Sequence, residues 1–252
     1  MLALARLLWF ATNSKANAGW CPICEKKSFF IEERPWLRDN YRCFRCRSIP
    51  RNRALMLVLS RLVPEYRAMH IHESSPAGAV SDKLAKECPN YLQTHYFQDT
   101  PPGAVKNGIR CENLERMTFP DERFDVIVTQ DVLEHVMNPD KAFAEIARTL
   151  RPGGVHIFTV PYYPSGKTRL RARETSLGIE YLAEKEFHGN PIDSEGSLVI
   201  SDWGNDFADY ILRCSGLATE IFHLTDRTMG IDGEFLEVFV SRKPDIGHEL
   251  SA

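Results

Sequence analysis

The sequence of 252 residues lacks any long hydrophobic run and any marked excess of charge of one sign. Its most apolar stretch, near the N-terminus, spans about ten residues, whereas a helix that crosses a membrane needs roughly 20. The 31 basic and 34 acidic residues leave a net charge of −3, so no global signal for binding a polyanion exists. We therefore expect no membrane span, and any case for nucleic-acid binding has to rest on a local patch.

Residues 1–18 also lack the strongly charged start that is typical of a secretory signal. Ala16-Asn17-Ala18 does resemble a site that signal peptidase cleaves, so secretion is the alternative. The favoured interpretation of residues 1–18 is an amphipathic lead-in helix. We accordingly expect a cytoplasmic protein.

Glycine is scarce at the place where a nucleotide-binding loop would need it. Residues 70–79 read HIHESSPAGA, between an apolar run and a helix-like pattern over 79–88. This is the strand–turn–helix layout of a nucleotide-binding loop, but two of its three expected glycines are missing. Serines and a proline can still form a tight turn whose N–H groups remain free. The residues alone leave open whether this is an altered cofactor loop or an ordinary turn.

The seven cysteines fall into two groups. One group forms two Cys-x-x-Cys pairs separated by 18 residues, and its members are Cys21, Cys24, Cys43 and Cys46. This spacing is a strong zinc signature, and four thiolates would close the coordination shell of a structural Zn²⁺. Two disulfides in an oxidising compartment are the alternative. The other group is scattered among apolar residues and is expected in the core: Cys88, Cys111 and Cys214.

Residues 34–53 carry seven arginines and one acid, with Trp36, Tyr41 and Phe44 among them. Arginines that hold a phosphate backbone, beside aromatics that stack bases, are typical of a nucleic-acid surface. The favoured interpretation is that the arginines offset the negative charge of a zinc–tetrathiolate site. A nucleic-acid partner is thus a less favoured alternative, since the net charge gives it no support.

The rest of the sequence alternates between strand and helix patterns. A connecting helix is expected over 51–66, helices over 79–88, 139–150 and 205–215, and strands at 68–72, 91–97, 108–111, 124–130, 155–160, 218–224 and 234–241. Strands that alternate with helices predict a parallel sheet covered on both faces. Residues 161–200, rich in proline and glycine, interrupt this alternation.

Residues 124–161, FDVIVTQDVLEHVMNPDKAFAEIARTLRPGGVHIFTVP, resemble a class I S-adenosylmethionine (SAM)-dependent methyltransferase of the type-11 kind. The segments RCENLERMTFPDERFD and FHGNPIDSEGSLVISDWG extend the similarity to a bacterial branch with a zinc ribbon in front. The resemblance implies an α/β fold with a Rossmann-like sheet, mostly parallel with the last strand antiparallel. It divides the chain into a ribbon over 19–50, a methyltransferase domain over 67–243 with an acceptor-side insertion at 161–200, and a tail over 244–252.

The resemblance also assigns candidate residues for binding SAM. Glu73 occupies the acid position of the cofactor loop, and Ser75 and Gly78 form its turn. Tyr96 is the candidate in the region where the family has its ribose-binding acid. That acid is absent here, although Asp99 lies nearby. The adenine side corresponds to Glu112, Asn113 and Leu114, while Gln130 and Asp131 end the fourth strand facing the methyl group.

The catalytic candidates are Asp131, His135 and His188. Methyl transfer from a sulfonium depends chiefly on holding donor and acceptor in line, and a base helps when the acceptor must lose a proton. A basic stretch within the insertion suggests an anionic small-molecule or glycan acceptor, with a solvated surface strand as the equal alternative: Lys167, Arg169, Arg171 and Arg173.

Two other functions compete with this interpretation. Tyr163 and Lys167 have the Tyr-x-x-x-Lys spacing of short-chain dehydrogenases, but Pro164 and Gly166 between them disfavour the helix that such a pair needs. The second alternative is a non-catalytic binding module, built on a decayed methyltransferase fold with a zinc ribbon.

Overall fold

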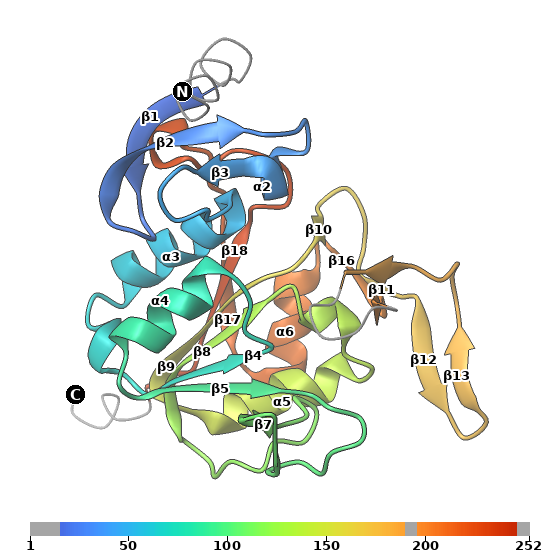
Figure 1. The fold of residues 1–252 in the computed structure, drawn as a ribbon. Helices are drawn as coiled ribbons and strands as arrows, with labels where there is room; N and C mark the ends of the chain where they lie inside the picture. The colour runs from blue at the N-terminus through green and yellow to red at the C-terminus, as the bar shows by residue number, and fades with distance from the viewer. Residues whose placement is uncertain (1–15, 190–195, 246–252) are drawn as a thin grey trace, which may run out of the picture.

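An eight-stranded sheet lies at the centre of the computed structural model, which describes residues 16–189 and 196–245 (Figure 1). Its strand order is β17-β18-β9-β8-β4-β5-β7-β6. The five middle strands run parallel, and β18 lies antiparallel to both of its neighbours. The predicted Rossmann-like sheet is confirmed. The strands are β4 (Ile71–Ser74), β5 (Tyr91–His95), β6 (Val105–Lys106), β7 (Ile109–Cys111), β8 (Phe124–Gln130), β9 (Leu150–Thr159), β17 (Ala218–Phe222) and β18 (Val238–Arg242).

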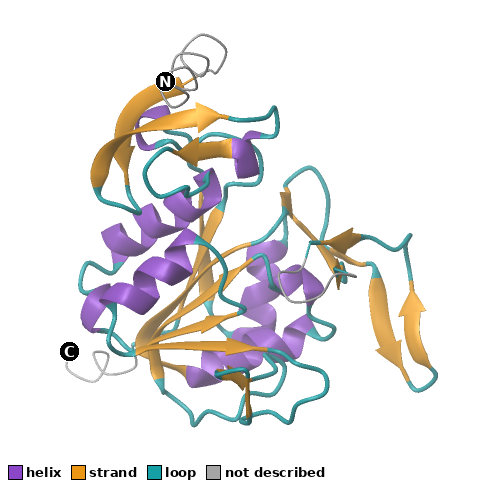
Figure 2. Ribbon diagram, in the orientation of Figure 1, coloured by secondary structure: helices purple, strands orange, loops and turns teal. Residues whose placement is uncertain are grey.

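Helices cover both faces of this sheet (Figure 2). One face is covered by α3 (Pro50–Leu62) and α4 (Ala79–Glu87), the other by α5 (Pro139–Thr149) and α6 (Phe207–Ser215). The central strand β8 serves both faces, because successive side chains alternate across a sheet. Val126 and Val128 belong to the core that includes the buried side of α3, and Ile127 to the core that includes Phe143 of α5. A strand buried on both faces therefore reads as a continuous apolar run.

The N-terminal residues form a small antiparallel sheet that sits against the edge of the main domain (Figure 1). It consists of β1 (Ala16–Cys21), β2 (Lys26–Glu32) and β3 (Tyr41–Cys43), with the one-turn helix α2 (Leu37–Asn40) between β2 and β3. We call residues 16–48 the ribbon. Gly19 of β1 lies so close to the η3 turn (Arg227–Met229) that a Cβ atom there would be 1.9 Å from the Thr228 carbonyl oxygen.

The ribbon and the main domain share one core. Phe30 and Tyr41 of the ribbon belong to the same buried cluster as Leu55 of α3. Arg53 of α3 is fully buried, and its guanidinium donates to the carbonyls of Tyr41 at 2.6 Å and Gly230 at 2.9 Å. One side chain thus joins the ribbon, the connecting helix and the loop between β17 and β18.

The insertion at 161–200 contains short strands that extend beyond the main sheet (Figure 1). The β12–β13 hairpin projects furthest from the body. The remaining short elements are η1 (Tyr66–Ala68), η2 (Leu133–His135), β10 (Tyr162–Tyr163), β11 (Arg169–Leu170), β12 (Ala172–Thr175), β13 (Gly178–Tyr181), β14 (Phe187–His188), β15 (Ser197–Leu198) and β16 (Ser201–Gly204).

Several predicted boundaries differ from the structure. The connecting helix ends at Leu62, before Pro64, and a 3₁₀ turn at 66–68 delays the first strand to Ile71. Strand β9 begins at Leu150, directly after α5, so the RPGG segment lies within a strand. The expected lead-in helix lies largely outside the described residues, as does most of the tail. No helix within 16–189 or 196–245 is long and apolar enough to cross a membrane.

Two histidines inside the sheet predict sensitivity to acid. His72 and His156 are fully buried, and burial lowers the pKa of each from 6.5 to about 3. The unfolded chain therefore binds protons first as the pH falls, so this contribution to stability is complete above about pH 6.5 and is lost toward about pH 3. We expect the free energy of unfolding to fall by roughly 2 kcal/mol per histidine between about pH 6.5 and about pH 5.

Urea unfolding at the two pH values checks this expectation. His156→Gln should reduce the loss of unfolding free energy on acidification. His223→Ala should leave that loss unchanged, because the His223 side chain is 64% exposed. Equal loss in wild type and His156→Gln would contradict the assignment.

Candidate active site

A cleft of about 1590 Å³ opens at the carboxyl ends of the parallel strands. The residues after β4, β5, β7 and β8 line one part of it, and the ribbon and the insertion line the rest. Ligands of open α/β sheets bind in this crevice, because the loops that follow adjacent strands meet there. The volume exceeds that of a typical single-ligand pocket, so two ligands of moderate size fit side by side.

The predicted cofactor loop forms a tight turn between β4 and α4. Ser75 adopts a left-handed conformation with φ of 55°, and Gly78 follows with φ of 79°. The Ser75 N–H donates to the Thr94 carbonyl at 2.8 Å, which ties the turn to β5. Ser75 lines the cleft and Gly78 does not. The missing glycines are thus replaced by a serine in a conformation that glycine usually adopts.

Glu73 lies at the end of β4 as the sequence predicts, but its side chain points into the protein. It is fully buried and is absent from the cleft lining. Its carboxylate accepts hydrogen bonds from Tyr91 at 2.6 Å, Gln130 at 2.7 Å and Ser81 at 2.8 Å. Burial raises its pKa, and the three donors act against that shift. The carboxylate therefore fastens the cofactor loop to β5, β8 and α4.

The other predicted cofactor residues divide in the same way. Tyr96, Asn113, Leu114 and Gln130 line the cleft. Glu112 does not, because it is buried and accepts from Arg110 at 2.7 Å and from the Thr118 N–H at 2.9 Å. The nearby acid Asp99 lines the cleft, bound to Lys106 at 2.5 Å.

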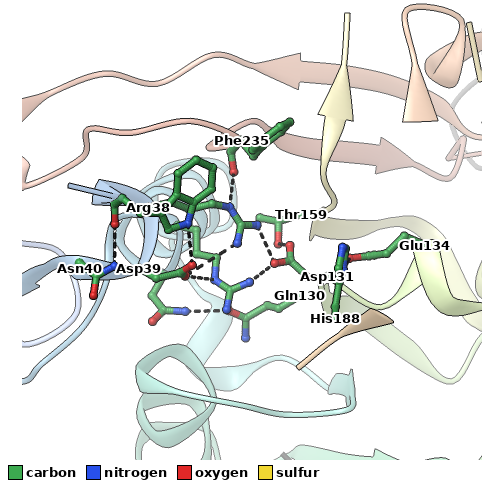
Figure 3. A network of polar contacts seen from close by, with 12 residues as sticks. Arg38, Asp39, Asn40, Gln130, Asp131, Glu134, Thr159, His188 and Phe235 are labelled. Carbon is green, nitrogen blue, oxygen red and sulfur yellow. Dashed lines mark hydrogen bonds and ion pairs between the residues drawn. The ribbon is translucent and has the colours of Figure 1, made fainter. Parts of the chain in front are cut away.

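Asp131 connects the cleft to the ribbon, as Figure 3 shows. One of its oxygens accepts from Arg38 of the ribbon at 2.6 Å and from Arg51 of α3, and the other accepts from Thr159 at 2.8 Å. Its backbone φ is 51°, a conformation that costs a non-glycine residue energy and that surrounding contacts must maintain. Both oxygens are engaged, so Asp131 forms part of the cleft wall.

The two predicted histidines meet at one end of the cleft. His135 comes from η2 and His188 from β14 in the insertion, and their ring centroids are 5.1 Å apart at an interplanar angle of 88°. Both line the cleft. Glu134 lies beside them, and its carboxylate is the main cause that raises the pKa of His188.

The basic stretch of the insertion is turned away from the cleft. None of its four members is among the lining residues, and each lies within ion-pair distance of an acid: Lys167 of Asp206, Arg169 and Arg171 of Asp202, and Arg173 of Glu180. These pairs explain the basic residues without an anionic ligand, so the structure offers no support for assigning them to the acceptor.

An aromatic wall of the cleft was not expected from the sequence. Trp36 of the ribbon, Phe235 of the β17–β18 loop and Tyr163 of β10 all line the cleft. The Phe235 ring centroid is 6.2 Å from that of Trp36 and 5.2 Å from that of Tyr163. The sequence feature that could have indicated this wall is the cluster of arginines and aromatics at 34–53, since Trp36, Arg38 and Arg51 all line the cleft.

The four cysteines of the ribbon converge on one point. Their sulfur atoms all lie within 4.8 Å of one another, and the set is Cys21, Cys24, Cys43 and Cys46. Four sulfur donors at this separation fit one tetrahedral ion. Burial lowers the pKa of Arg53, and the negative charges of Cys21 and Cys43 act to raise it. This arginine is therefore placed to offset thiolate charge.

Comparison with known proteins gives one family and several relatives. Residues 77–158 match the family model of a methyltransferase domain. A ubiquinone/menaquinone biosynthesis C-methyltransferase of Hydrogenovibrio crunogenus is 48% identical over 42 residues, which are 17% of this chain and 16% of that protein. A probable SAM-dependent methyltransferase of Mycolicibacterium smegmatis is 40% identical over 53 residues, 21% of each chain. The chain thus matches about a sixth to a fifth of the length of these curated relatives.

Among solved structures, a SAM-dependent methyltransferase from Mesorhizobium loti is similar with a TM-score of 0.49. Its sequence is 16% identical, and the match covers 75% of this chain and 98% of that one.

Proposed function

We propose an activity for the methyltransferase domain that this chain carries: transfer of a methyl group from SAM to a small-molecule acceptor. The observation that supports it most is the cleft at the carboxyl ends of β4, β5, β7 and β8, next to the matched residues 77–158. The cleft has a cofactor end around Ser75 and Tyr96 and an acceptor end around His135 and His188.

The residues at the cofactor end fit SAM. Tyr96 is 49% exposed and offers a flat face to the adenine, with Leu114 as a second apolar surface. Asn113 supplies an amide to the adenine edge, and Asp99 supplies the acid that ribose hydroxyls require. The turn at Ser75 leads into the N-terminus of α4, where the helix dipole favours the methionine carboxylate. Glu73 acts by fastening this loop.

The residues at the acceptor end fit a small molecule with a flat apolar part. Trp36, Phe235 and Tyr163 present aromatic surface to it. Arg38 and Arg51, held by Asp131, set the position of the ribbon wall opposite the histidines. The arrangement does not favour a nucleic acid, because two further arginines of the ribbon, Arg42 and Arg47, are paired with Glu33.

When bound, SAM supplies an electrophilic methyl group on sulfur, and in-line attack by the acceptor breaks the carbon–sulfur bond, whose electron pair stays on sulfur. The chain contributes by holding two ligands at adjacent ends of one cleft, and such positioning is worth roughly 7–11 kcal/mol of the barrier. His135 and His188 line the acceptor end of the cleft, while Asp131 supports the wall beside them.

We also propose that the ribbon binds a structural zinc ion. Four sulfur donors leave no coordination position for a substrate, so the ion would hold the ribbon in its fold. Thiolate ligands of this kind persist in a reducing compartment, which supports a cytoplasmic location.

Thermal unfolding with and without SAM tests the proposed function. A ligand that binds the folded state alone stabilises it, so SAM should raise the melting temperature. Tyr96→Ala should weaken SAM binding roughly tenfold or more, because the stacking of a base on an aromatic ring contributes about 1–3 kcal/mol. Isothermal titration calorimetry gives the two affinities.

Tyr181→Ala is the matched control, since Tyr181 is 43% exposed on the β12–β13 hairpin and is absent from the cleft lining. It should bind SAM as wild type does. If SAM neither binds to wild type nor shifts its melting, the protein is the non-catalytic binding module instead.

A further inference from the structure

Glu134 is an acid that the methyl-transfer scheme leaves unexplained. It is 1% exposed, and neither of its carboxylate oxygens has a hydrogen-bond partner among the described residues. Burying a charge without partners is costly, and buried charges in proteins are paired or coordinate metals. Its immediate neighbours are two imidazole nitrogens, at 3.7 Å on His135 and 3.8 Å on His188, both measured to Oε1.

His135 presents a bare nitrogen to this carboxylate. Its Nδ1 lies 2.9 Å from the Leu198 carbonyl oxygen. A carbonyl can only accept, so the proton sits on Nδ1, and in the neutral ring Nε2 keeps its lone pair. That nitrogen is the one 3.7 Å from Glu134.

His188, at the end of β14, also has one ring nitrogen directed at Glu134 and the other near a second acceptor. Its Nε2 lies 3.5 Å from the carboxylate of Glu186, an acceptor, and its Nδ1 faces Glu134. A ligand histidine in a metal site almost always gives its other N–H to a carboxylate or a backbone carbonyl, which fixes the ring and the tautomer. His135 meets that description through the Leu198 carbonyl, and Glu186 lies at ion-pair distance from the second ring nitrogen of His188.

We propose that Glu134, His135 and His188 form a second metal site, which binds one divalent transition metal ion at the acceptor end of the cleft. The three donor atoms lie within 4.8 Å of one another. Ligands about 2.0–2.1 Å from a tetrahedral ion are roughly 3.4 Å apart, so the two measured nitrogen–oxygen distances need to contract by only a few tenths of an ångström. Imidazole and carboxylate ligands suit zinc, cobalt or iron rather than magnesium or calcium.

The surroundings leave room for this ion. Arg38 and Arg51, two basic groups that line the cleft, are already bound to Asp131, and Figure 3 shows Arg38 directed at this carboxylate. Three protein ligands leave at least one coordination position, and both histidines line the cleft, so that position faces the acceptor. Taken together with the proposed function, on which this step rests, the ion selects an acceptor that offers an oxygen or nitrogen ligand next to the atom that is methylated.

Cobalt titration tests the site without SAM. Protein whose ribbon is loaded with zinc should bind one further Co²⁺ per chain, with visible d–d absorption and without the thiolate-to-cobalt charge-transfer band that exchange into the ribbon would produce. His188→Ala should weaken this binding at least 10- to 100-fold, the range already seen when only an outer hydrogen bond to a metal ligand is lost.

Glu134→Gln should weaken it similarly, and because it keeps the shape of the buried side chain it serves as the second variant. His223→Ala, an exposed histidine outside the cleft, should bind as wild type does. The proposal is overturned if zinc-loaded wild type binds no further cobalt, which would leave a metal-free ion pair of His188 and Glu134, or if both ligand variants bind it unchanged. SAM binding is measured separately by melting, so cobalt binding without SAM binding rejects the proposed function and retains the site.

Discussion

Cys43→Ser is expected to remove the ribbon's zinc and to lower the free energy of unfolding by several kcal/mol. Cys43 is fully buried and supplies one of the four sulfur atoms that converge, so its loss leaves an incomplete shell. A segment of roughly 30 residues cannot bury enough surface to stay folded alone, and binding of structural zinc contributes about 10–16 kcal/mol in peptides of this kind. Metal analysis and the thiolate-to-cobalt charge-transfer band of the cobalt-substituted protein measure the loss.

The effect should extend beyond the ribbon. Trp36 and Arg38 form part of the cleft wall, so the variant should also lose acceptor-dependent activity once an acceptor is known. Cys214→Ser is the control, because Cys214 is a free thiol on α6, outside the cysteine cluster. A Cys43→Ser protein that retains zinc and melts like wild type would contradict the ribbon site.

Glu73→Ala is expected to destabilise the fold by about 3 kcal/mol or more. The substitution leaves three donors without their acceptor, a buried one on Ser81 and partly buried ones on Tyr91 and Gln130, and hydrogen bonds to a charged group contribute about 1.5–3 kcal/mol each. Ser81→Ala, which removes one donor and leaves the carboxylate, should cost less, about 1.5 kcal/mol. Urea unfolding of both variants gives the comparison.

A double-mutant cycle separates the two roles that Glu73 could have. Tyr91→Phe combined with Glu73→Ala should cost less than the sum of the single changes, because the two side chains share one hydrogen bond. If Glu73→Ala instead unfolds like wild type but binds SAM poorly, Glu73 acts on the cofactor directly.

Local patterns in the sequence were sufficient for the sheet. β8 is a continuous apolar run because Val126, Ile127 and Val128 are all buried, and α5 begins at Pro139 as its pattern predicts. The spacing of the paired cysteines likewise predicts that they come together, and their sulfur atoms do lie within 4.8 Å of one another. The direction of the Glu73 side chain could not be predicted in this way, since position at a strand end does not say whether a group faces the cleft or the core.

Contacts between distant segments account for most of the features that the sequence could not predict. Arg38 lies 93 residues from its partner Asp131, and no local signal marks either as part of a pair. The loop between β17 and β18 reads as turn-rich, but Gly230 within it contacts Phe30 of the ribbon so closely that a Cβ would lie 2.4 Å from the ring. Such complementarity appears only when both surfaces are in place.

The hydrogen bond between Arg53 and Gly230 links positions 177 residues apart, and this separation has a consequence for folding during synthesis. Chains fold from the N-terminus as they emerge, and the four cysteines, all within residues 21–46, can bind their ion while most of the chain has not been made. The loop that covers Phe30, which contains Gly230, emerges only after the strands between them have been made. Until then the apolar side of the ribbon is uncovered on the ribosome-bound chain, where such surfaces promote aggregation. With the proposed zinc site, zinc supply should therefore limit the yield of native protein at an early stage of translation, before the strands that line the cleft are made.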